Sequence, residues 1–190
     1  MKTTTSTYNA SFTAASMMFN ETLVVVQMLL EENSTSTKKR LKEDAQYLKI
    51  QATSSRERVT TELSKRFDTM PRSFWEIFMT LPEDQQKFAL FYVILKTYRL
   101  LFEFQVDLAL PKYNSIDRVL CNGDVLMKIS EIAATDELVN SWTEQTRQKI
   151  ASCYITILKQ AGLINHSTGE LMPPSLSDDA YIQYVRSGEL

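Results

Sequence analysis

Apolar side chains recur at helical spacing through the first part of the chain. A helical pattern covers residues 12–30, and a shorter, more basic one covers residues 37–49. In a third segment, residues 54–68, Val59 and Leu63 are four positions apart. Because this spacing places side chains on one face of an α-helix, each segment predicts a helix with one buried stripe.

The pattern changes near the middle of the chain, where hydrophobic positions are no longer confined to one face. Pro71 predicts the start of a short aromatic helix over residues 74–80. Residues 82–110 predict one long helix of about 43 Å at a rise of 1.5 Å per residue, ended by Pro111. A helix that is apolar all round is typical of the buried centre of a helical core.

The last part of the pattern predicts further helices over residues 124–133, 136–141 and 142–161. Gly162 occupies the position of a helix C-cap. Apolar pairs on both sides of the polar turn 165–169 predict a small C-terminal β-hairpin wing.

Three Ser/Thr-x-x-Glu patterns predict where helices begin. They are Ser54–Glu57, Thr80–Glu83 and Ser141–Glu144. In such a capping box the hydroxyl accepts from the third helical N–H while the glutamate reaches back.

The elements together predict an all-α globular bundle of several helices around the buried central helix. We expect an N-terminal helical subdomain over residues 1–80. Residues 81–190 then supply the core helix and a winged-helix-like subdomain, and both parts can share one core.

Composition narrows the function classes. Only 4 Gly and 5 Pro occur in 190 residues, which disfavours an all-β fold and leaves no glycine-rich phosphate loop. One histidine and two cysteines exclude most metal sites and catalytic triads. We therefore expect no enzyme, no cofactor and no metal. We find no signal peptide and no apolar run of about 20 residues, so we expect a cytoplasmic protein without a membrane segment.

Charge is distributed unevenly along the chain. Residues 33–72 carry ten basic and five acidic side chains, a net charge of +5, whereas the remaining residues sum to −7. Local charge is what a nucleic-acid backbone senses. The alternative interpretation is a solvated, charged helix pair.

Two segments have the form of a helix-turn-helix. In each, a short helix (37–49 or 136–141) precedes a longer one (54–68 or 142–161) that begins with polar and basic residues. A recognition helix enters the major groove with that end. The second segment is electrically neutral, and an ordinary helical hairpin with a tail is the alternative for it. The candidate nucleic-acid contacts are Lys38, Lys39, Arg40, Lys42, Ser54, Ser55, Arg56, Arg58, Lys65, Thr146, Arg147 and Lys149.

Several stretches that follow one another along nearly the whole chain form a recognisable set. They are Tyr8–Thr13, Ser54–Arg58, Lys96–Phe104, Thr146–Arg147, Leu158–Ile164 and Gly169–Ser177. In this order they resemble the BrxA family of bacteriophage exclusion (BREX) defence systems. The resemblance implies an all-α, non-catalytic protein with helix-turn-helix elements. It also implies double-stranded DNA binding and work beside the system's methyltransferase and ATPase.

Two other functions stay open at this point. One is a protein-interaction adaptor of the defence complex that does not touch nucleic acid. The other is an RNA-binding factor, because a helical fold like that of the antitermination protein NusB has been suggested for the family. We expect a monomer in each case.

Overall fold

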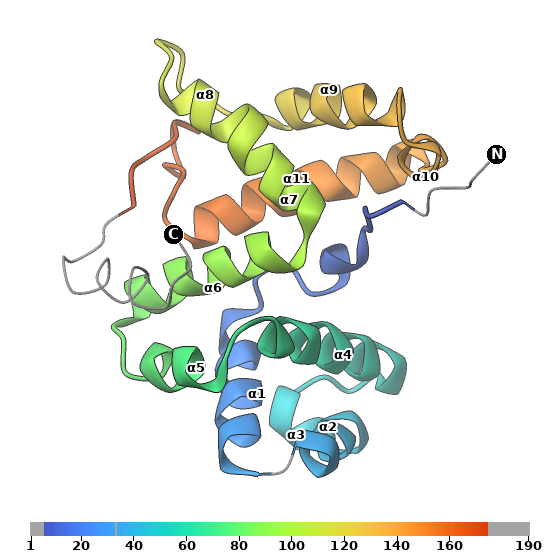
Figure 1. The fold of residues 1–190 in the computed structure, drawn as a ribbon, viewed down its shortest axis with the longest axis vertical. Helices are drawn as coiled ribbons and strands as arrows, with labels where there is room; N and C mark the ends of the chain where they lie inside the picture. The colour runs from blue at the N-terminus through green and yellow to red at the C-terminus, as the bar shows by residue number, and fades with distance from the viewer. Residues whose placement is uncertain (1–5, 33, 175–190) are drawn as a thin grey trace.

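A computed structural model of the chain describes residues 6–32 and 34–174, and these residues are almost entirely helical (Figure 1). In chain order the elements are the 3₁₀ turn η1 (Ser11–Ala14), α1 (Phe19–Glu31), α2 (Ser34–Glu43), α3 (Ala45–Leu48), α4 (Thr53–Thr69), α5 (Arg72–Phe78), α6 (Glu83–Thr97), α7 (Arg99–Phe104), the π-helical turn η2 (Gln105–Ala109), α8 (Leu110–Tyr113), α9 (Asn122–Ala133), α10 (Glu137–Asn140) and α11 (Glu144–Gln160). The all-α prediction is therefore confirmed. Within the described residues, no helix is long and apolar enough to cross a membrane.

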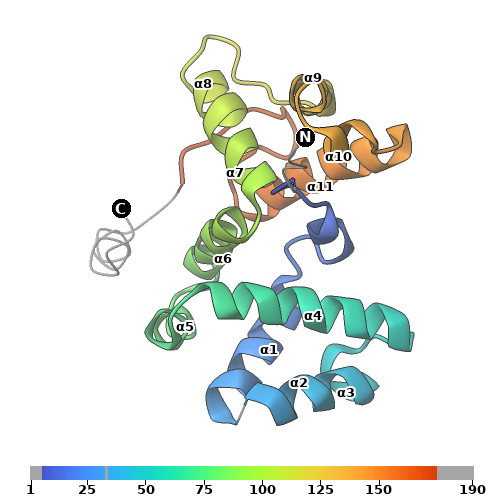
Figure 2. The ribbon, with the colours of Figure 1, turned by 45° about the vertical axis from the view of Figure 1, so that its right-hand side comes forward.

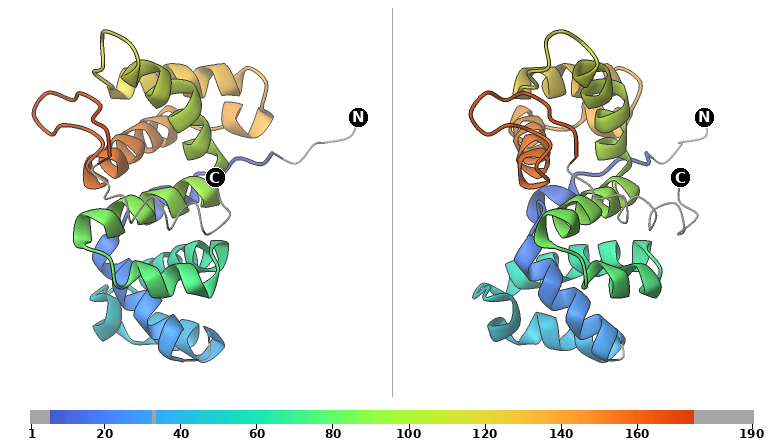
Figure 3. Two further views of the ribbon diagram at one scale, coloured as in Figure 1. Left: turned by 60° about the vertical axis from the view of Figure 1, so that its left-hand side comes forward. Right: turned by 90° about the vertical axis from the view of Figure 1, so that its left-hand side faces the viewer.

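The helices are stacked in two groups. Helices α1–α5 form one end of the molecule, α7–α11 form the other, and α6 lies between them (Figures 1 and 2). The same stacking is visible after the molecule is turned by 60° and by 90° about the vertical axis, where α11 passes beneath α7 and α9 (Figure 3). The central position of α6 agrees with the apolar character of its sequence.

Two clusters of buried side chains hold the stack together. The smaller one joins α1–α4 through Val25, Leu29, Leu41, Leu48, Val59 and Leu63. The larger one runs from η1 to the end of α11 and includes Trp75 and Phe78 from α5 beside Leu90 and Ile94 from α6. Because this cluster crosses residue 80, the two parts share a core there, while the domain division at that residue stays a prediction.

The prediction of a single helix over residues 12–30 is wrong. The chain forms η1, turns, and then begins α1, because Ser16 and Met18 have φ values of 40° and 47° in the left-handed region. This turn points the carbonyl oxygens of Ser16 and Met17 toward the guanidinium of Arg66, which donates to both.

The continuous helix predicted over residues 82–110 is also wrong. Tyr98 adopts φ −126° and ψ 102°, which ends α6 and begins α7 in a new direction. Further along, η2 widens into π-helix just before Pro111. Proline cannot donate to the carbonyl four residues earlier and its ring crowds that carbonyl, so a wider turn accommodates it. Pro111 lies inside α8 and does not end the helix.

The helix predicted over residues 37–49 is interrupted at Asp44. This residue ends α2 and caps α3, since its carboxylate accepts from the Gln46 N–H at 2.8 Å. Lys49 then takes a left-handed φ of 55° and closes α3.

The three predicted capping boxes do not form at the expected residues. Helix α4 begins after Ala52 and α6 after Pro82, and neither residue makes a side-chain cap. Helix α11 begins after Thr143, whose hydroxyl accepts from the Thr146 N–H at 3.2 Å. Helix starts were thus predicted within about three residues, but the capping residues were not.

The C-cap at Gly162 is confirmed. Its φ of 74° permits a 3.1 Å bond from its N–H to Lys159 O and a 2.9 Å bond from the Leu163 N–H to Leu158 O. This pair of hydrogen bonds is a Schellman motif.

The expected hairpin follows as a turn closed by a 2.8 Å bond from the Asn165 N–H to Glu170 O. It carries isolated bridges, Ile164 with Leu171 and Val119 with Glu170, and no named strand in the described part of the chain.

Candidate nucleic-acid interface

The first predicted helix-turn-helix is built from α2, α3 and α4. Leu41 and Leu48 from the first two helices pack with Val59 and Leu63 of α4 in the smaller core cluster. The connection between α3 and α4 spans residues 49–52. The first turns of α4 therefore stand at the edge of this unit, with Ser54 and Ser55 exposed.

Arg56 does not face solvent with its neighbours. It is only 4% exposed, and its guanidinium bonds to main-chain oxygens on both sides of the turn. Nε donates to Lys42 O at 2.7 Å, and Nη1 donates to Ile50 O at 2.7 Å and to Gln51 O at 3.1 Å. Nη2 donates to Glu43 O at 3.2 Å. These bonds tie the end of α2 to the start of α4. Arg56 therefore has a structural role, and we no longer count it among the candidate nucleic-acid contacts.

Three of the predicted cations on α2 are already paired within the described residues. Lys38 Nζ lies 2.9 Å from Asp68, and Lys39 Nζ lies 3.8 Å from Glu43 at i, i+4. Arg40 donates to Glu32 at 2.6 Å and also contacts Tyr47. The hydrogen bond from Arg40 holds the pKa of the Glu32 carboxyl below its ordinary value. Because all three cations are paired with carboxylates, Lys38, Lys39 and Arg40 add less positive charge to this face than their number suggests.

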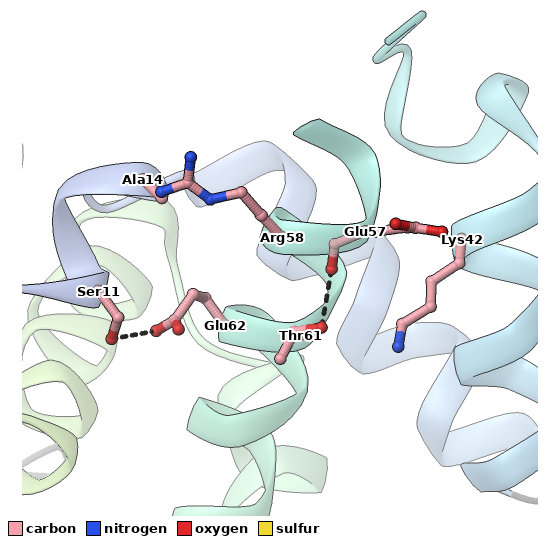
Figure 4. A pocket seen from close by; sticks show the side chains of 7 residues that line it. All are labelled: Ser11, Ala14, Lys42, Glu57, Arg58, Thr61 and Glu62. Atoms are coloured by element: carbon pink, nitrogen blue, oxygen red, sulfur yellow. Dashed lines mark hydrogen bonds between the residues drawn. The ribbon is translucent and has the colours of Figure 1, made fainter. Parts of the chain in front are cut away.

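Lys42 and Arg58 differ from this paired group. Neither has an ion pair within the described part of the chain. Both line a cavity of about 420 Å³ between η1, α2 and α4. Figure 4 shows Arg58 extending from α4 toward Ala14 of η1, and Lys42 reaching from α2 on the other side of Thr61.

Lys65 is the remaining predicted contact in this unit. It is exposed, and its ammonium lies 4.8 Å from the centre of the Tyr98 ring, a cation–π distance. The structure thus brings Ser54, Ser55, Arg58 and Lys65 to exposed positions of α4.

The second predicted unit consists of α10 and α11, and its predicted residues have three different surroundings. Arg147 is half-buried and donates to Trp142 O at 3.2 Å and Asn140 O at 3.1 Å. Thr146 is half-buried, and its hydroxyl lies 3.0 Å from that of Thr143 at the start of α11. Lys149 is exposed on the next turn.

A turn beside α11 forms the wing-like part of this unit. The Leu171 N–H donates to Arg118 O at 2.9 Å, and the Met172 N–H donates to Leu163 O at 2.8 Å. The segment 170–172 therefore lies between residues 118–120 and residues 163–165. Figure 3 shows this loop projecting beside the end of α11.

A buried polar network joins the first unit to the core, and sequence patterns did not predict it. Arg66 of α4 is fully buried and donates through Nε to the Tyr98 hydroxyl at 3.2 Å. The same hydroxyl donates to Glu62 at 2.7 Å, and Glu62 accepts from the Ser11 hydroxyl at 3.0 Å. Burial raises the pKa of Tyr98 to about 12. We find no periodicity signal for these residues, because α4 is buried against α6 as well as against α2.

The described residues contain no group of three or more His, Cys, Asp or Glu side chains that could hold a metal ion. The predicted contact residues of both units are ammonium, guanidinium and hydroxyl donors, which suit hydrogen bonding to phosphates and bases.

A model of the BrxA family matches residues 6–185 of the chain. A curated relative, the BREX protein BrxA of Bacillus cereus (strain H3081.97), is 29% identical over 106 residues, which is 55% of this chain and 52% of the relative. The alignment thus spans about half the length of that relative.

The fold is also similar to a crystal structure of an uncharacterized protein from Magnetospirillum magneticum. The TM-score is 0.84 at 20% sequence identity, over 97% of this chain and 95% of the other. This similarity extends the all-α fold to an experimentally determined structure. Given the family match over nearly its whole length, the chain belongs to the BrxA family.

Proposed function

We propose that this chain is a non-catalytic component of a BREX phage-defence system that binds duplex DNA through its helix-turn-helix elements. The observation that carries the proposal is the exposed start of α4, where Ser54, Ser55 and Arg58 stand in a segment of net charge +5. Arginine and hydroxyl side chains at the start of a recognition helix can reach base edges and phosphates.

The second unit supports the proposal less strongly. Its helices α10 and α11 are followed by the bridged turn at residues 163–172, an order typical of a winged helix. Of the residues predicted to contact DNA there, Lys149 is exposed while Arg147 is turned toward main-chain carbonyls. We therefore assign α4 the leading role and α11 a supporting one.

The test is a gel-shift titration of the full chain with duplex DNA at several salt concentrations. Affinity is expected to fall steeply with salt, because each neutralised phosphate releases a counterion. Absence of binding at low salt would contradict the proposal. Structured RNA that outcompetes duplex DNA of equal length would instead favour an RNA-binding function.

A second candidate function is that of a protein-interaction adaptor toward partners such as the system's methyltransferase and ATPase. It is favoured by apolar side chains left exposed along α7, η2 and α8, where Phe102, Val106 and Leu110 are 52%, 41% and 45% exposed. Clustered exposed apolar residues often mark protein interaction sites.

Pull-down of both partners after nuclease treatment separates the two functions. Partners retained by the wild type and lost by Phe102→Ser would support the adaptor function. Partners lost after nuclease treatment would contradict it.

A further inference from the structure

A second cavity, of about 510 Å³, follows the seam between α2 and α4. Lys38 and Lys42 line it from α2. From α4 it is lined by Thr61, Ser64, Lys65, Asp68 and Thr69. Three lysines against one aspartate give this lining a net charge of +2. We call it the α2–α4 pocket, and it adjoins the cavity of Figure 4, since Lys42 and Thr61 line both.

The hydroxyl of Ser64 distinguishes the α2–α4 pocket from an ordinary groove between helices. Ser64 is 6% exposed, and its Oγ has no hydrogen-bond partner among the described residues. The other two hydroxyls of the lining are paired with their own helix. Thr61 donates to Glu57 O at 2.8 Å, and Thr69 donates to Lys65 O at 3.0 Å. The Oγ itself has almost no accessible surface, so a ligand in the pocket gains this donor when the Ser64 side chain rotates toward it. A buried hydroxyl without a partner costs folding free energy, which favours that rotation when a ligand is present.

The charges around Ser64 define what kind of ligand fits. The Lys42 ammonium has no ion pair in the described part of the chain, and Lys38 shares its charge with Asp68 at 2.9 Å. Lysine ammonium groups bind phosphate as point charges, and a hydroxyl can donate to a phosphate oxygen. The volume lies within the range of about 300–1,000 Å³ that is typical of ligand pockets.

We infer that the α2–α4 pocket binds a phosphate group, with Lys42, Lys38 and Ser64 as its donors. The phosphate is supplied either by the backbone of bound duplex DNA or by a free phosphorylated small molecule. Only the first source rests on the proposed DNA binding. The pocket lies on the same helix as the exposed start of α4, so a DNA strand along α4 can reach both.

The first experiment measures binding of inorganic phosphate and of ATP to the full chain by ³¹P NMR and calorimetry. Ser64→Ala and Lys42→Gln are each expected to weaken binding about fivefold or more, in line with loss of one charge-assisted bond. Asp68→Asn is expected to strengthen it, because the change frees Lys38. The matched control is Lys39→Gln, which removes the same charge from the same helix but lies outside the pocket lining.

The melting temperature of Ser64→Ala separates a ligand donor from a structural residue. If Ser64 had only a structural role, its removal would lower the melting temperature. Because the hydroxyl has no partner in the ligand-free protein, its removal is expected to leave the melting temperature unchanged or raised. Loss of phosphate binding without loss of stability is the signature of a ligand donor. A lowered melting temperature would assign Ser64 a structural role and contradict the inference.

The second experiment identifies the source of the phosphate by titrating the same variants with duplex DNA. If the backbone supplies it, Ser64→Ala weakens duplex binding and inorganic phosphate competes. If a small molecule supplies it, duplex affinity is unchanged while ATP or phosphate binding is lost; both outcomes support the pocket. The inference would be overturned if the wild type bound neither phosphate nor ATP. It would also be overturned if Ser64→Ala and Lys42→Gln both bound them as tightly as the wild type. DNA binding that persists in that case and depends on Arg58 would leave the proposed function intact.

Discussion

In both predicted helix-turn-helix units, an arginine at the start of the second helix bonds to the turn that precedes it. The fourth residue of α4 is Arg56 and the fourth residue of α11 is Arg147, and each guanidinium donates to main-chain oxygens of the preceding turn. The units differ in how much depends on that arginine. Helix α4 has no side-chain cap, whereas α11 has Thr143. An arginine at the start of a second helix is thus as much a turn-holding residue as a DNA contact.

The largest effect should come from removing each arginine in turn. Arg56→Ala removes the buried guanidinium that donates to four main-chain carbonyls and is expected to lower the free energy of unfolding by about 3 kcal/mol. Arg147→Ala, at a half-buried site with a capped helix, is expected to cost about 1 kcal/mol. Chemical denaturation of both variants measures this difference.

Arg58→Ala is the matched control for Arg56→Ala, because it removes the same side chain from an exposed position two residues away. It is expected to change the free energy of unfolding by less than about 0.5 kcal/mol. Equal losses for the two α4 arginines would mean that the carbonyl bonds of Arg56 do not hold the turn.

The second effect concerns the attachment of the first unit to the core through Tyr98, whose hydroxyl joins a network with Arg66 and Glu62. Tyr154 of α11 is also buried, and its hydroxyl makes a single bond, to Gln105 at 3.0 Å. Burial raises the pKa of Tyr98 from 10.0 to about 12 in the folded protein. This raised pKa contributes stability that is complete below pH 10 and is lost as the pH rises through about 12.

Tyr98 is expected to contribute about 2 kcal/mol to the loss over that interval, and Tyr98→Phe should remove that share. Unfolding experiments between pH 9 and pH 12 measure the change. The pKa values of Tyr8 and Tyr154 are also raised, so these residues contribute shares of their own. Tyr8→Phe is the comparison variant, which should leave the Tyr98 share in place. An identical pH profile for the wild type and Tyr98→Phe would contradict this assignment.

The third effect compares the starts of the two second helices. Thr143→Ala removes the α11 cap and is expected to cost about 1 kcal/mol. Ser54→Ala in α4 is expected to be nearly neutral, since the residue before α4 is Ala52 and Ser54 makes no cap bond. Thermal unfolding of the two variants measures the difference. If Ser54→Ala lost more stability than Thr143→Ala, Ser54 would act as a helix cap, as the sequence pattern predicted.

Sequence periodicity predicted α4, α9 and α11 closely, because each has a clear apolar stripe and a turn at its end. It missed the break at Tyr98, since the apolar pattern continues there without Gly or Pro. The hydroxyl of Tyr98 bonds to Arg66 and Glu62, which are far away in sequence, and no local pattern contains those contacts.

The candidate interface was predictable only in part, for a similar reason. Charge patterning found the basic segment, but it could not separate Arg56 from Arg58. The direction of a guanidinium depends on which carbonyls the turn presents, and that is fixed by α2 and α3 packing on α4. The pairing of Lys38 with Asp68 across thirty residues was likewise outside any local pattern.

The smallest effect tests which unit contributes more to nucleic-acid binding. Arg58→Gln is expected to lower duplex affinity about threefold to fivefold and to reduce the salt dependence by about one counterion. Lys149→Gln on α11 should change affinity by less, because that unit carries no excess positive charge. Gel-shift titrations at matched salt measure both, and neither exposed substitution should alter the melting temperature. If Lys149→Gln had the larger effect, α11 and its bridged turn would become the main contact. The basic segment around α4 would then serve to attract DNA over a distance, because screened charges steer association even where they make no close contact.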